Sequence, residues 1–336
     1  MPSFSDFIHT QLILKIPIPT SSFASKVVII TGANSGLGKE AAKHIVRLGA
    51  SKVILGCRSL SKGNKAQHEI ETSVQCSPGT IEVWELDLES PSSVRAFADQ
   101  AKALPRVDVL INNAGIQTTK LHLTYGAERT LAVNVIGTFL LALQLIPKLQ
   151  ETAKIHGDTP HMTFVGSALY DLARYPEEHA DDILAWPSEK PQMNRLQQYN
   201  LSKLLLLYVV IKLASFVDPI TKDDNPGSSP IVINAMDPCF SKTGLHDEIT
   251  GGSNLLFKVF EFLFARPAEE SSRLVVAAAS AGRQSHGQYL RGGTVHQYAT
   301  FLTTPDGAKR GNDVWEQLGR KLEELQPGIL ESLKAT

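Results

Sequence analysis

The chain has 336 residues, of which 43% are hydrophobic, and its 33 basic and 34 acidic side chains give a formal net charge of −1. This balance indicates a globular protein and argues against nucleic acid or an anionic membrane as a partner. The three scattered cysteines fit neither a disulfide framework nor a zinc cluster, which favours a reducing, cytoplasmic compartment without a metal site. The length suffices for one large α/β domain or two small ones.

The first 24 residues are expected to form an N-terminal arm ahead of a single domain that spans 25–330. The segment Ile8–Ile18 is apolar, but it contains Lys15 and Pro17 and is too short to cross a bilayer. We therefore expect no signal peptide and no transmembrane segment, and an arm that packs on the surface of the domain. Contact with a membrane surface is the alternative.

Apolar, strand-like runs alternate with helical patterns from residue 26 onward. The expected strands are Lys26–Thr31, Lys52–Gly56, Thr80–Leu86, Val107–Asn112, His161–Gly166 and Pro230–Ala235. The expected helices are Gly36–Leu48, Leu60–Ser73, Pro91–Leu104, Gly126–Gln150 and Gln197–Phe216. Several strands are almost continuously apolar, as parallel strands covered on both faces are. The alternation predicts one doubly wound α/β domain of the Rossmann type, with a parallel sheet and helices on both faces.

The first strand runs into a glycine-rich turn and then into a helix. Unpaired N–H groups at a helix start carry partial positive charge, so a pyrophosphate is stabilised there, and glycines let the backbone approach it. We predict that this turn binds a nucleotide through Gly32, Asn34, Ser35, Gly36, Leu37 and Gly38. A glycine turn without a ligand is the alternative, because such motifs also occur by chance.

The end of the second strand decides between NAD and NADP. In dinucleotide-binding folds an acidic residue there binds the ribose hydroxyl of NAD, whereas an arginine suits the 2′-phosphate of NADP. Here Arg58 follows the strand and Lys62 adds a positive charge four residues later. Because a guanidinium offers phosphate a planar pair of donors, we predict NADP(H) as the cofactor. A solvated surface arginine is the alternative interpretation.

A tyrosine and a lysine at i and i+4, Tyr199 and Lys203, share one helix face. The reference pKa of a phenol is about 10, and a nearby ammonium lowers it by stabilising the phenolate. We therefore expect Tyr199 to exchange a proton with a carbonyl or alcohol oxygen. Tyr208 and Lys212 repeat the spacing nine residues later, on the opposite side of the helix. Since Tyr208 lies in an apolar run, we expect it in the core.

Two further polar residues are candidates for the catalytic set. Ser167 follows the fifth strand, where its hydroxyl would hydrogen-bond a substrate oxygen as charge develops there; the alternative is a serine that starts a turn. Asn134 lies within an apolar helical stretch and needs a partner if it is buried. A buried amide satisfied by the backbone is the alternative.

These motifs, in order, resemble the short-chain dehydrogenase/reductase family over about residues 25–290, and more loosely its retinol-dehydrogenase-like members and the reductases of fungal secondary metabolism. They are T-G-x-x-x-G-x-G at 31–38, N-N-A-G at 112–115 and Y-x-x-S-K at 199–203. The resemblance implies that Asn134 holds a water linked to Lys203, and that Lys203 also holds the nicotinamide ribose. It further implies cofactor contacts by Asp87, Leu88, Asn113, Ala114, Gly115, Tyr199, Pro238 and Thr243.

The chain departs from the family pattern in three places. Ser167 and Tyr199 stand 32 residues apart, where many members have about a dozen, so the inserted segment 168–198 is expected to form part of the substrate wall. The family's Pro-Gly after the sixth strand reads Pro238-Cys239, and we expect Cys239 to be a packing residue, with a reactive thiol as the alternative. Within the second insertion, 240–266, the aromatic stretch 255–264 predicts a helix that either covers an apolar substrate or faces the core.

We therefore predict an NADPH-dependent oxidoreductase that interconverts a carbonyl and an alcohol on an apolar, polyketide- or terpenoid-like small molecule. C=C reduction or non-redox chemistry with the same cofactor, and an inactive NADP-binding protein, are the alternatives. The two longest predicted helices either pair between subunits, which would give a homodimer, or pack inside one chain.

Overall fold

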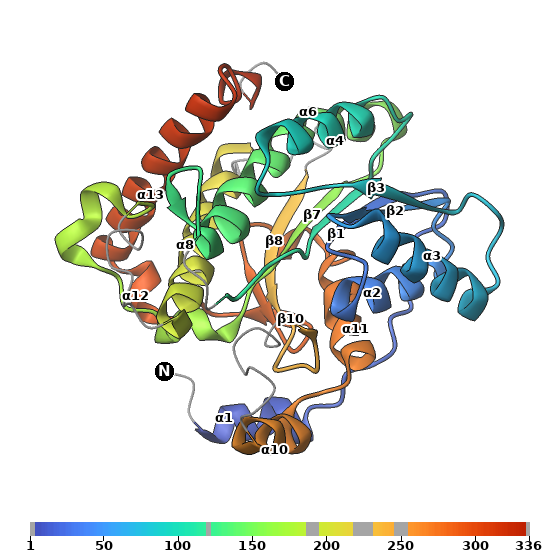
Figure 1. The fold of residues 1–336 in the computed structure, drawn as a ribbon, viewed down its shortest axis with the longest axis horizontal. Coiled ribbons are helices and arrows are strands. Elements are labelled where there is room, and N and C mark those ends of the chain that lie inside the picture. The colour runs from blue at the N-terminus through green and yellow to red at the C-terminus, as the bar shows by residue number, and fades with distance from the viewer. Residues whose placement is uncertain (1–3, 119–121, 186–194, 218–230, 245–254, 334–336) are drawn as a thin grey trace.

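The computed structural model describes residues 4–118, 122–185, 195–217, 231–244 and 255–333. Its centre is an eight-stranded sheet in the order β10-β9-β8-β7-β4-β1-β2-β3, flanked by helices on both faces (Figure 1). The strands are β1 Val27–Thr31, β2 Lys52–Cys57, β3 Ile81–Glu85, β4 Val109–Asn112, β7 His161–Val165, β8 Val232–Asp237, β9 Tyr289–Arg291 and β10 Thr294–His296. A separate short pair consists of β5 Leu123–Thr124 and β6 Ala127–Glu128.

Helices cover both faces of this sheet. The α-helices are α1 Phe4–Ile8, α2 Gly36–Arg47, α3 Leu60–Val74, α4 Pro91–Lys102, α5 Arg129–Leu131, α6 Thr138–His156, α8 Arg195–Val217, α10 Leu255–Phe264, α11 Ala268–Ala278, α12 Thr300–Thr303 and α13 Pro305–Leu325. Two π-helical segments are η1 His9–Ile13 and η2 Ala132–Gly137, and the 3₁₀ segments are η3 Ala168–Leu172, η4 Glu177–Asp182, η6 Arg283–Ser285 and η7 Glu331–Leu333. Helices α2 and α11 cover one face, and α4, α6 and α8 cover the other.

Strand β1 shows why the sheet needs both layers. All five of its residues are buried. Val28 and Ile30 belong to the apolar cluster that includes α2 and α11, whereas Val27 and Ile29 belong to the cluster of α4, α6 and α8. Because successive side chains point to opposite faces of a strand, a continuous apolar run is buried only when both faces are covered.

The predicted fold is confirmed, with corrections to one helix and to one edge of the sheet. The predicted strands, and the predicted helices except the fourth, lie within two residues of the observed ones. The helix expected from Gly126 instead begins at Arg129, passes through the π-helical turn η2 and continues to His156. The sheet is not wholly parallel, because β10 runs antiparallel to β9. Strands β9 and β10 and helices α11 and α13 were not predicted.

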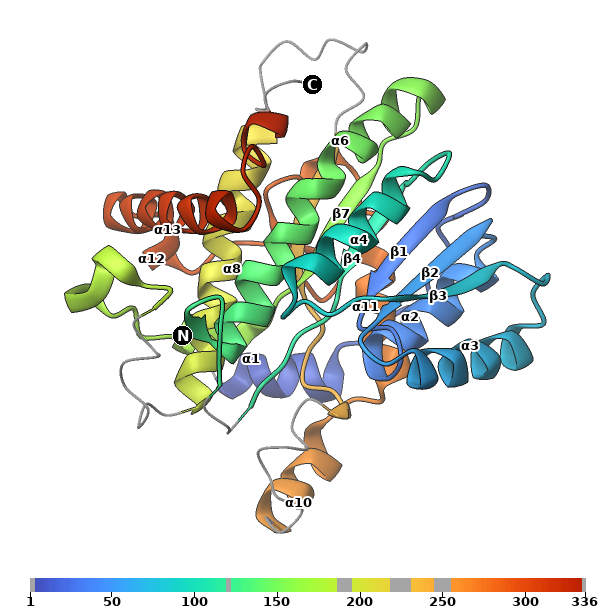
Figure 2. The same ribbon diagram turned by 45° about the horizontal axis from the view of Figure 1, so that its top comes forward.

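Helices α6 and α8 are the two described helices long and apolar enough to span a membrane by length and composition. The apolar window over Arg129–His156 is 94% buried inside the protein, and that over Leu196–Val217 is 72% buried. Helix α13 packs against α8, which it crosses in Figure 2. Its residues Val314 and Leu318 are buried. This burial fits core helices and favours internal packing over pairing between subunits.

Two arginines, one just before α11 and one within it, fix the N-terminal segment to this part of the chain. Arg266 donates hydrogen bonds to the backbone oxygens of Thr10 and Leu14, and Arg273 donates one to that of Ile16. Helix α10 lies beside α1 and projects from the body of the domain in Figure 2. The side chain of Phe262 is 75% exposed. The expectation of a core-facing helix is therefore wrong for this segment.

Candidate functional site

The turns that follow β1 and β4 pack directly on each other. Gly32 and Gly36 have φ angles of +66° and +54°, which glycine adopts without the cost that a side chain would add. A Cβ atom on Gly32 would lie 2.9 Å from the Cα of Ala114, and one on Gly38 would lie 2.6 Å from Nδ2 of Asn113. Glycine is thus required at these positions by close approach between two turns of the same domain.

Four hydrogen bonds hold the two turns together. The hydroxyl of Thr31 accepts the backbone N–H groups of Asn113 and Ala114 at 3.1 and 2.9 Å. The side-chain amide of Asn113 donates to the backbone oxygens of Thr31 and Gly32 at 2.9 and 3.2 Å. The Asn113 amide therefore has a structural role in joining β1 to β4, which the sequence motif alone did not reveal.

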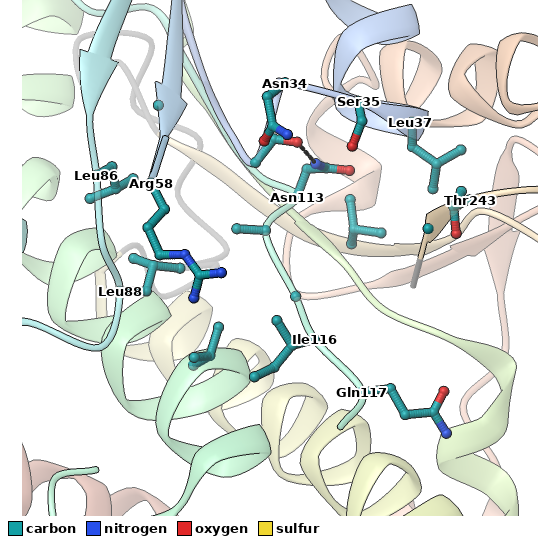
Figure 3. A pocket seen from close by; sticks show the side chains of 18 of the residues that line it. Asn34, Ser35, Leu37, Arg58, Leu86, Leu88, Asn113, Ile116, Gln117 and Thr243 are labelled. Atoms are coloured by element: carbon teal, nitrogen blue, oxygen red, sulfur yellow. Dashed lines mark hydrogen bonds between the residues drawn. The ribbon is translucent and has the colours of Figure 1, made fainter. Parts of the chain in front are cut away.

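A cavity of about 470 Å³ lies at the carboxyl ends of the parallel strands. Most of the predicted site residues line it: Gly32, Asn34, Ser35, Gly36, Leu37, Arg58, Lys62, Asp87, Leu88, Asn113, Ala114, Gly115, Tyr199, Lys203, Pro238 and Thr243. Figure 3 shows Arg58 beside Leu88 and Thr243 near Leu37. Gly38, Asn134 and Ser167 do not line the cavity. The lining residues that were not predicted include Glu89, Ile116, Gln117 and Arg129.

Arg58 extends into this cavity from the end of β2, with 62% of its side chain exposed. Its Nη1 donates to Oε2 of Glu89 at 3.3 Å, and Glu89 in turn accepts two hydrogen bonds of 2.8 Å from Arg129. Burial opposes ionisation of Glu89, but the hydrogen bonds and charge of Arg129 outweigh it, so the pKa of Glu89 is lowered. The carboxylate is therefore anchored mainly by Arg129, which leaves most of the Arg58 fork exposed.

Tyr199 and Lys203 lie on α8 and are both almost fully buried. The ammonium of Lys203 is 5.6 Å from the centroid of the Tyr199 ring, and it donates to the backbone oxygen of Val165 at 2.7 Å. Burial raises the pKa of Tyr199, and a hydrogen bond with Ser167 only partly opposes this. The expected lowering of the phenol pKa by Lys203 is therefore wrong, because burial is the larger effect. Tyr208 lies in the core, as predicted.

The hydroxyl of Ser167 forms hydrogen bonds with two neighbours. It bonds with the side chain of Tyr199, and it also accepts the backbone N–H of Leu169 at 3.2 Å, which caps the start of η3. The turn start that the alternative interpretation predicts is therefore present, and the hydrogen bond to a substrate oxygen stays a prediction.

The side chain of Asn134 lies in the π-helical segment η2 and is satisfied inside the protein. It accepts from the backbone N–H of Ile116 at 2.8 Å and donates to the Ile116 oxygen and the Ser202 hydroxyl, both at 3.0 Å. This matches the alternative of a buried amide bonded to backbone. A Cβ on Gly115 would lie 3.3 Å from Asn134 Oδ1 and 3.7 Å from Lys203 Nζ, so both side chains border the same glycine. The link to Lys203 through water stays a prediction.

Burial lowers the pKa of Lys203 to about 8, from 10.5. Between these two pH values Lys203 holds a proton in the unfolded chain but not in the folded one. The burial of Lys203 therefore costs free energy at neutral pH, and this cost falls as the pH rises. Replacing Lys203 by Met is therefore expected to stabilise the protein at pH 7 by up to about 3 kcal/mol, less the lost hydrogen bond to Val165. Denaturant unfolding at pH 7, 8.5 and 10 measures this, and the advantage of the variant should shrink with pH. A variant that is less stable at pH 7 would contradict the prediction.

Comparison with known proteins identifies the chain. Residues 26–158 match the family model of short chain dehydrogenases. Over 331 residues the chain is 38% identical to the short chain dehydrogenase/reductase dmxR8 of Cryptosporiopsis sp., with 96% of this chain and 98% of that protein covered. The chain belongs to the short-chain dehydrogenase/reductase family. It is also 41% identical over 305 residues to the short chain dehydrogenase atnD of Emericella nidulans, with 90% and 94% covered.

Solved structures of short-chain dehydrogenases/reductases share the fold. One is 3-ketoacyl-(acyl-carrier-protein) reductase from Brucella melitensis complexed with NADH, with a TM-score of 0.57, 23% identity, and coverage of 80% of this chain and 97% of that one. Another is the RhlG/NADP complex of Pseudomonas aeruginosa, with a TM-score of 0.59, 20% identity, and coverage of 81% and 96%. The expected family resemblance, including that to fungal members, is confirmed, and the protein is an oxidoreductase by family.

Proposed function

We propose that this short-chain dehydrogenase/reductase uses NADP(H) to interconvert a carbonyl and an alcohol on an apolar small molecule. The proposal rests on one cavity. It is lined by the glycine-rich turn at the start of α2, residues 32–38, which we call the glycine cradle, and also by Tyr199 and Lys203. A cofactor and a proton-transferring group thereby share one space. We propose that it acts in the cytoplasm, in the biosynthesis of a secondary metabolite.

The cradle fits a nicotinamide dinucleotide. Ser35, at the N-cap of α2, makes no side-chain capping bond, so the first N–H groups of the helix stay open to an anion. The glycine turn would hold the diphosphate, Asp87 the adenosine end, and Thr243 the nicotinamide. Arg58 would hold the 2′-phosphate of NADP. The cofactor, when bound, supplies or accepts the hydride.

Tyr199 then acts as the acid in carbonyl reduction. Its raised pKa keeps the phenol protonated at neutral pH, which is the state that donates a proton to a carbonyl oxygen. Ser167, which is hydrogen-bonded to Tyr199, would donate to the same oxygen. Lys203, fixed to the Val165 backbone, would orient the nicotinamide ribose. In the reverse reaction, alcohol oxidation, the same Tyr199 oxygen would take the proton back as the base.

The Arg58 assignment is tested directly by binding. Replacing Arg58 by Ala is expected to weaken NADPH binding by about 10- to 100-fold, since a charge-assisted hydrogen bond contributes roughly 1.5–3 kcal/mol. NADH, which lacks the 2′-phosphate, should bind as before. Titration followed by nicotinamide fluorescence measures both constants, and the exposed Arg47 on α2, replaced by Ala, is the matched control. Equal loss for the two cofactors would contradict the assignment, and failure of the wild type to bind either would remove the proposal.

The insertions 168–198 and 240–266, predicted to form the substrate wall, include residues 186–194 and 245–254, which lie outside the described residues. The described part of the first insertion, 168–185, contributes no lining residue to the cavity. The proposal of an apolar substrate therefore rests on the aromatic residues of α10. Product analysis after reaction with NADPH deuterated at the transferred position would distinguish carbonyl reduction from C=C reduction.

A further inference from the structure

A buried carboxylate joins the two loops on either side of the proposed active site. Asp237 is the last residue of β8, and it is 5% exposed. Its Oδ1 accepts the backbone N–H of Ala168 at 3.3 Å and that of Cys239 at 3.2 Å. Ala168 directly follows Ser167, and Cys239 directly follows Pro238, which lines the cavity. One oxygen atom thus ties the loop of the active serine to the loop expected beside the nicotinamide.

The second of these bonds holds a strained backbone. Cys239 has a φ of +65°, in the left-handed region that costs a residue with a side chain about 1–2 kcal/mol. An aspartate that accepts the N–H two residues later forms a turn of the kind that stabilises such conformations. Cys239 is 9% exposed and packs in the apolar cluster. The bond from its N–H to Asp237 is therefore a local interaction that keeps this residue in the left-handed conformation.

The charge of Asp237 has its own counterion. Oδ2 lies 3.7 Å from Nε of Arg291 on β9, at ion-pair distance but too far for a hydrogen bond. Burial raises the pKa of Asp237, whereas Arg291, the two N–H groups and His296 oppose that rise. The sheet edge that sequence patterns did not predict therefore supplies the cation that makes a buried carboxylate tolerable here.

We propose that Asp237 is a positioning residue of this enzyme, which sets Ser167 against the Pro238–Cys239 turn by holding both backbones. The inference rests on the proposed function, because it assigns a role in that same site. Without the carboxylate, Cys239 would relax from its left-handed conformation and the two loops would separate. Ser167 would then lose its position relative to Tyr199, and the Pro238 side of the cavity would shift.

The test combines two substitutions at Asp237 with two at Cys239. The readouts are the NADPH dissociation constant, and kcat and KM for reduction of 9,10-phenanthrenequinone, an apolar aromatic diketone, by NADPH. Asp237→Ala is expected to lower kcat about tenfold, since two backbone hydrogen bonds of roughly 0.5–1.5 kcal/mol each are lost. It should also weaken NADPH binding, because the Pro238 side of the cavity shifts. Asp237→Asn should keep more of the turnover than Asp237→Ala, because its amide oxygen still accepts both N–H groups.

Glycine at 239 distinguishes positioning from general damage. In the Asp237→Ala background, Cys239→Gly should recover NADPH affinity and part of kcat, because glycine adopts a positive φ without strain. Cys239→Ala removes the same sulfur but keeps the Cβ, so it should not recover them. Equal recovery by both, or wild-type kcat in Asp237→Ala, would overturn the inference. If Asp237→Ala does not fold, Asp237→Asn decides instead: a kcat below one tenth of the wild-type value would overturn it.

Failure of the proposed function gives a different result. A wild-type protein that binds no NADPH, or that turns over as well with Phe at position 199, would remove the proposed function. A wild-type protein that binds NADPH and depends on Tyr199, but is indifferent to the four substitutions at Asp237 and Cys239, would overturn only the positioning role. Circular dichroism of each variant confirms that the fold is retained.

Discussion

Phe in place of Tyr199 is expected to lower turnover by about 10²- to 10⁴-fold, the usual contribution of a positioned acid or base. The substitution removes one hydroxyl and leaves the buried ring, so packing on α8 is preserved. The hydrogen bond with Ser167 is lost, but no described contact of the Tyr199 hydroxyl supports the glycine cradle. NADPH binding should therefore stay within a few-fold of the wild-type value while kcat for quinone reduction falls.

Tyr208 provides the control on the same helix. It repeats the spacing to a lysine, but it is buried among core residues and its ring packs 6.5 Å from that of Tyr175. It does not line the cavity. Tyr208→Phe should therefore turn over substrate like the wild type. Equal losses in the two variants would show that the effect of Tyr199→Phe comes from the helix and not from proton transfer, and undiminished turnover in Tyr199→Phe would exclude the mechanism.

The central sheet was predictable because its strands are buried on both faces. Val28 and Ile29 point to opposite faces of the sheet, and both must be apolar because helices cover both faces. Strand β1 therefore appears as an unbroken apolar run in the sequence. The site followed from the same pattern, since ligands of such sheets bind at the carboxyl ends of the strands. Arg58 lines the cavity from the end of β2, and Tyr199 and Lys203 line it from the first half of α8.

Short strands, one long-range ion pair and one glycine-containing helix were not predicted, for physical reasons. Strands β9 and β10 have three residues each, too few for a periodic signal. Glu89 and Arg129 are 40 residues apart and meet only after folding, so their ion pair has no local signature. Helix α13 is amphipathic but contains Gly307, Gly311 and Gly319, which lower its helix propensity.

The pKa of Tyr199 shows a further limit of motif reasoning. The spacing to Lys203 correctly predicted that the two side chains lie together. It carried no information on burial, which acts on both groups and raises the pKa of the phenol while it lowers that of the ammonium. Desolvation is a property of everything packed around a group, and it becomes visible only in three dimensions.

Ala in place of Gly38 is expected to disrupt the glycine-rich turn after β1, although Gly38 itself does not line the cavity. The added Cβ would lie 2.6 Å from Asn113 Nδ2 and 2.9 Å from the backbone oxygen of Gly32, so one of the two turns must move. Overpacking of this kind costs about 1–3 kcal/mol, and displacement of the Asn113 amide loses two hydrogen bonds of roughly 1 kcal/mol each. The higher helix propensity of Ala returns only about 1 kcal/mol. We expect a net loss of about 2–4 kcal/mol in the free energy of unfolding.

Because the turn that moves is the one that would hold the diphosphate, NADPH binding should weaken at least about tenfold in the same variant. A double-mutant cycle with Asn113→Ala isolates the cause. Once the Asn113 amide is absent, the methyl group at position 38 loses its shortest contact and keeps those with the Gly32 oxygen and the Cα of Ala33, so Gly38→Ala should cost less in that background than in the wild type. Denaturant unfolding and NADPH titration give both free energies for all four proteins. Strictly additive losses would show that contact with Asn113 is not what requires glycine at position 38.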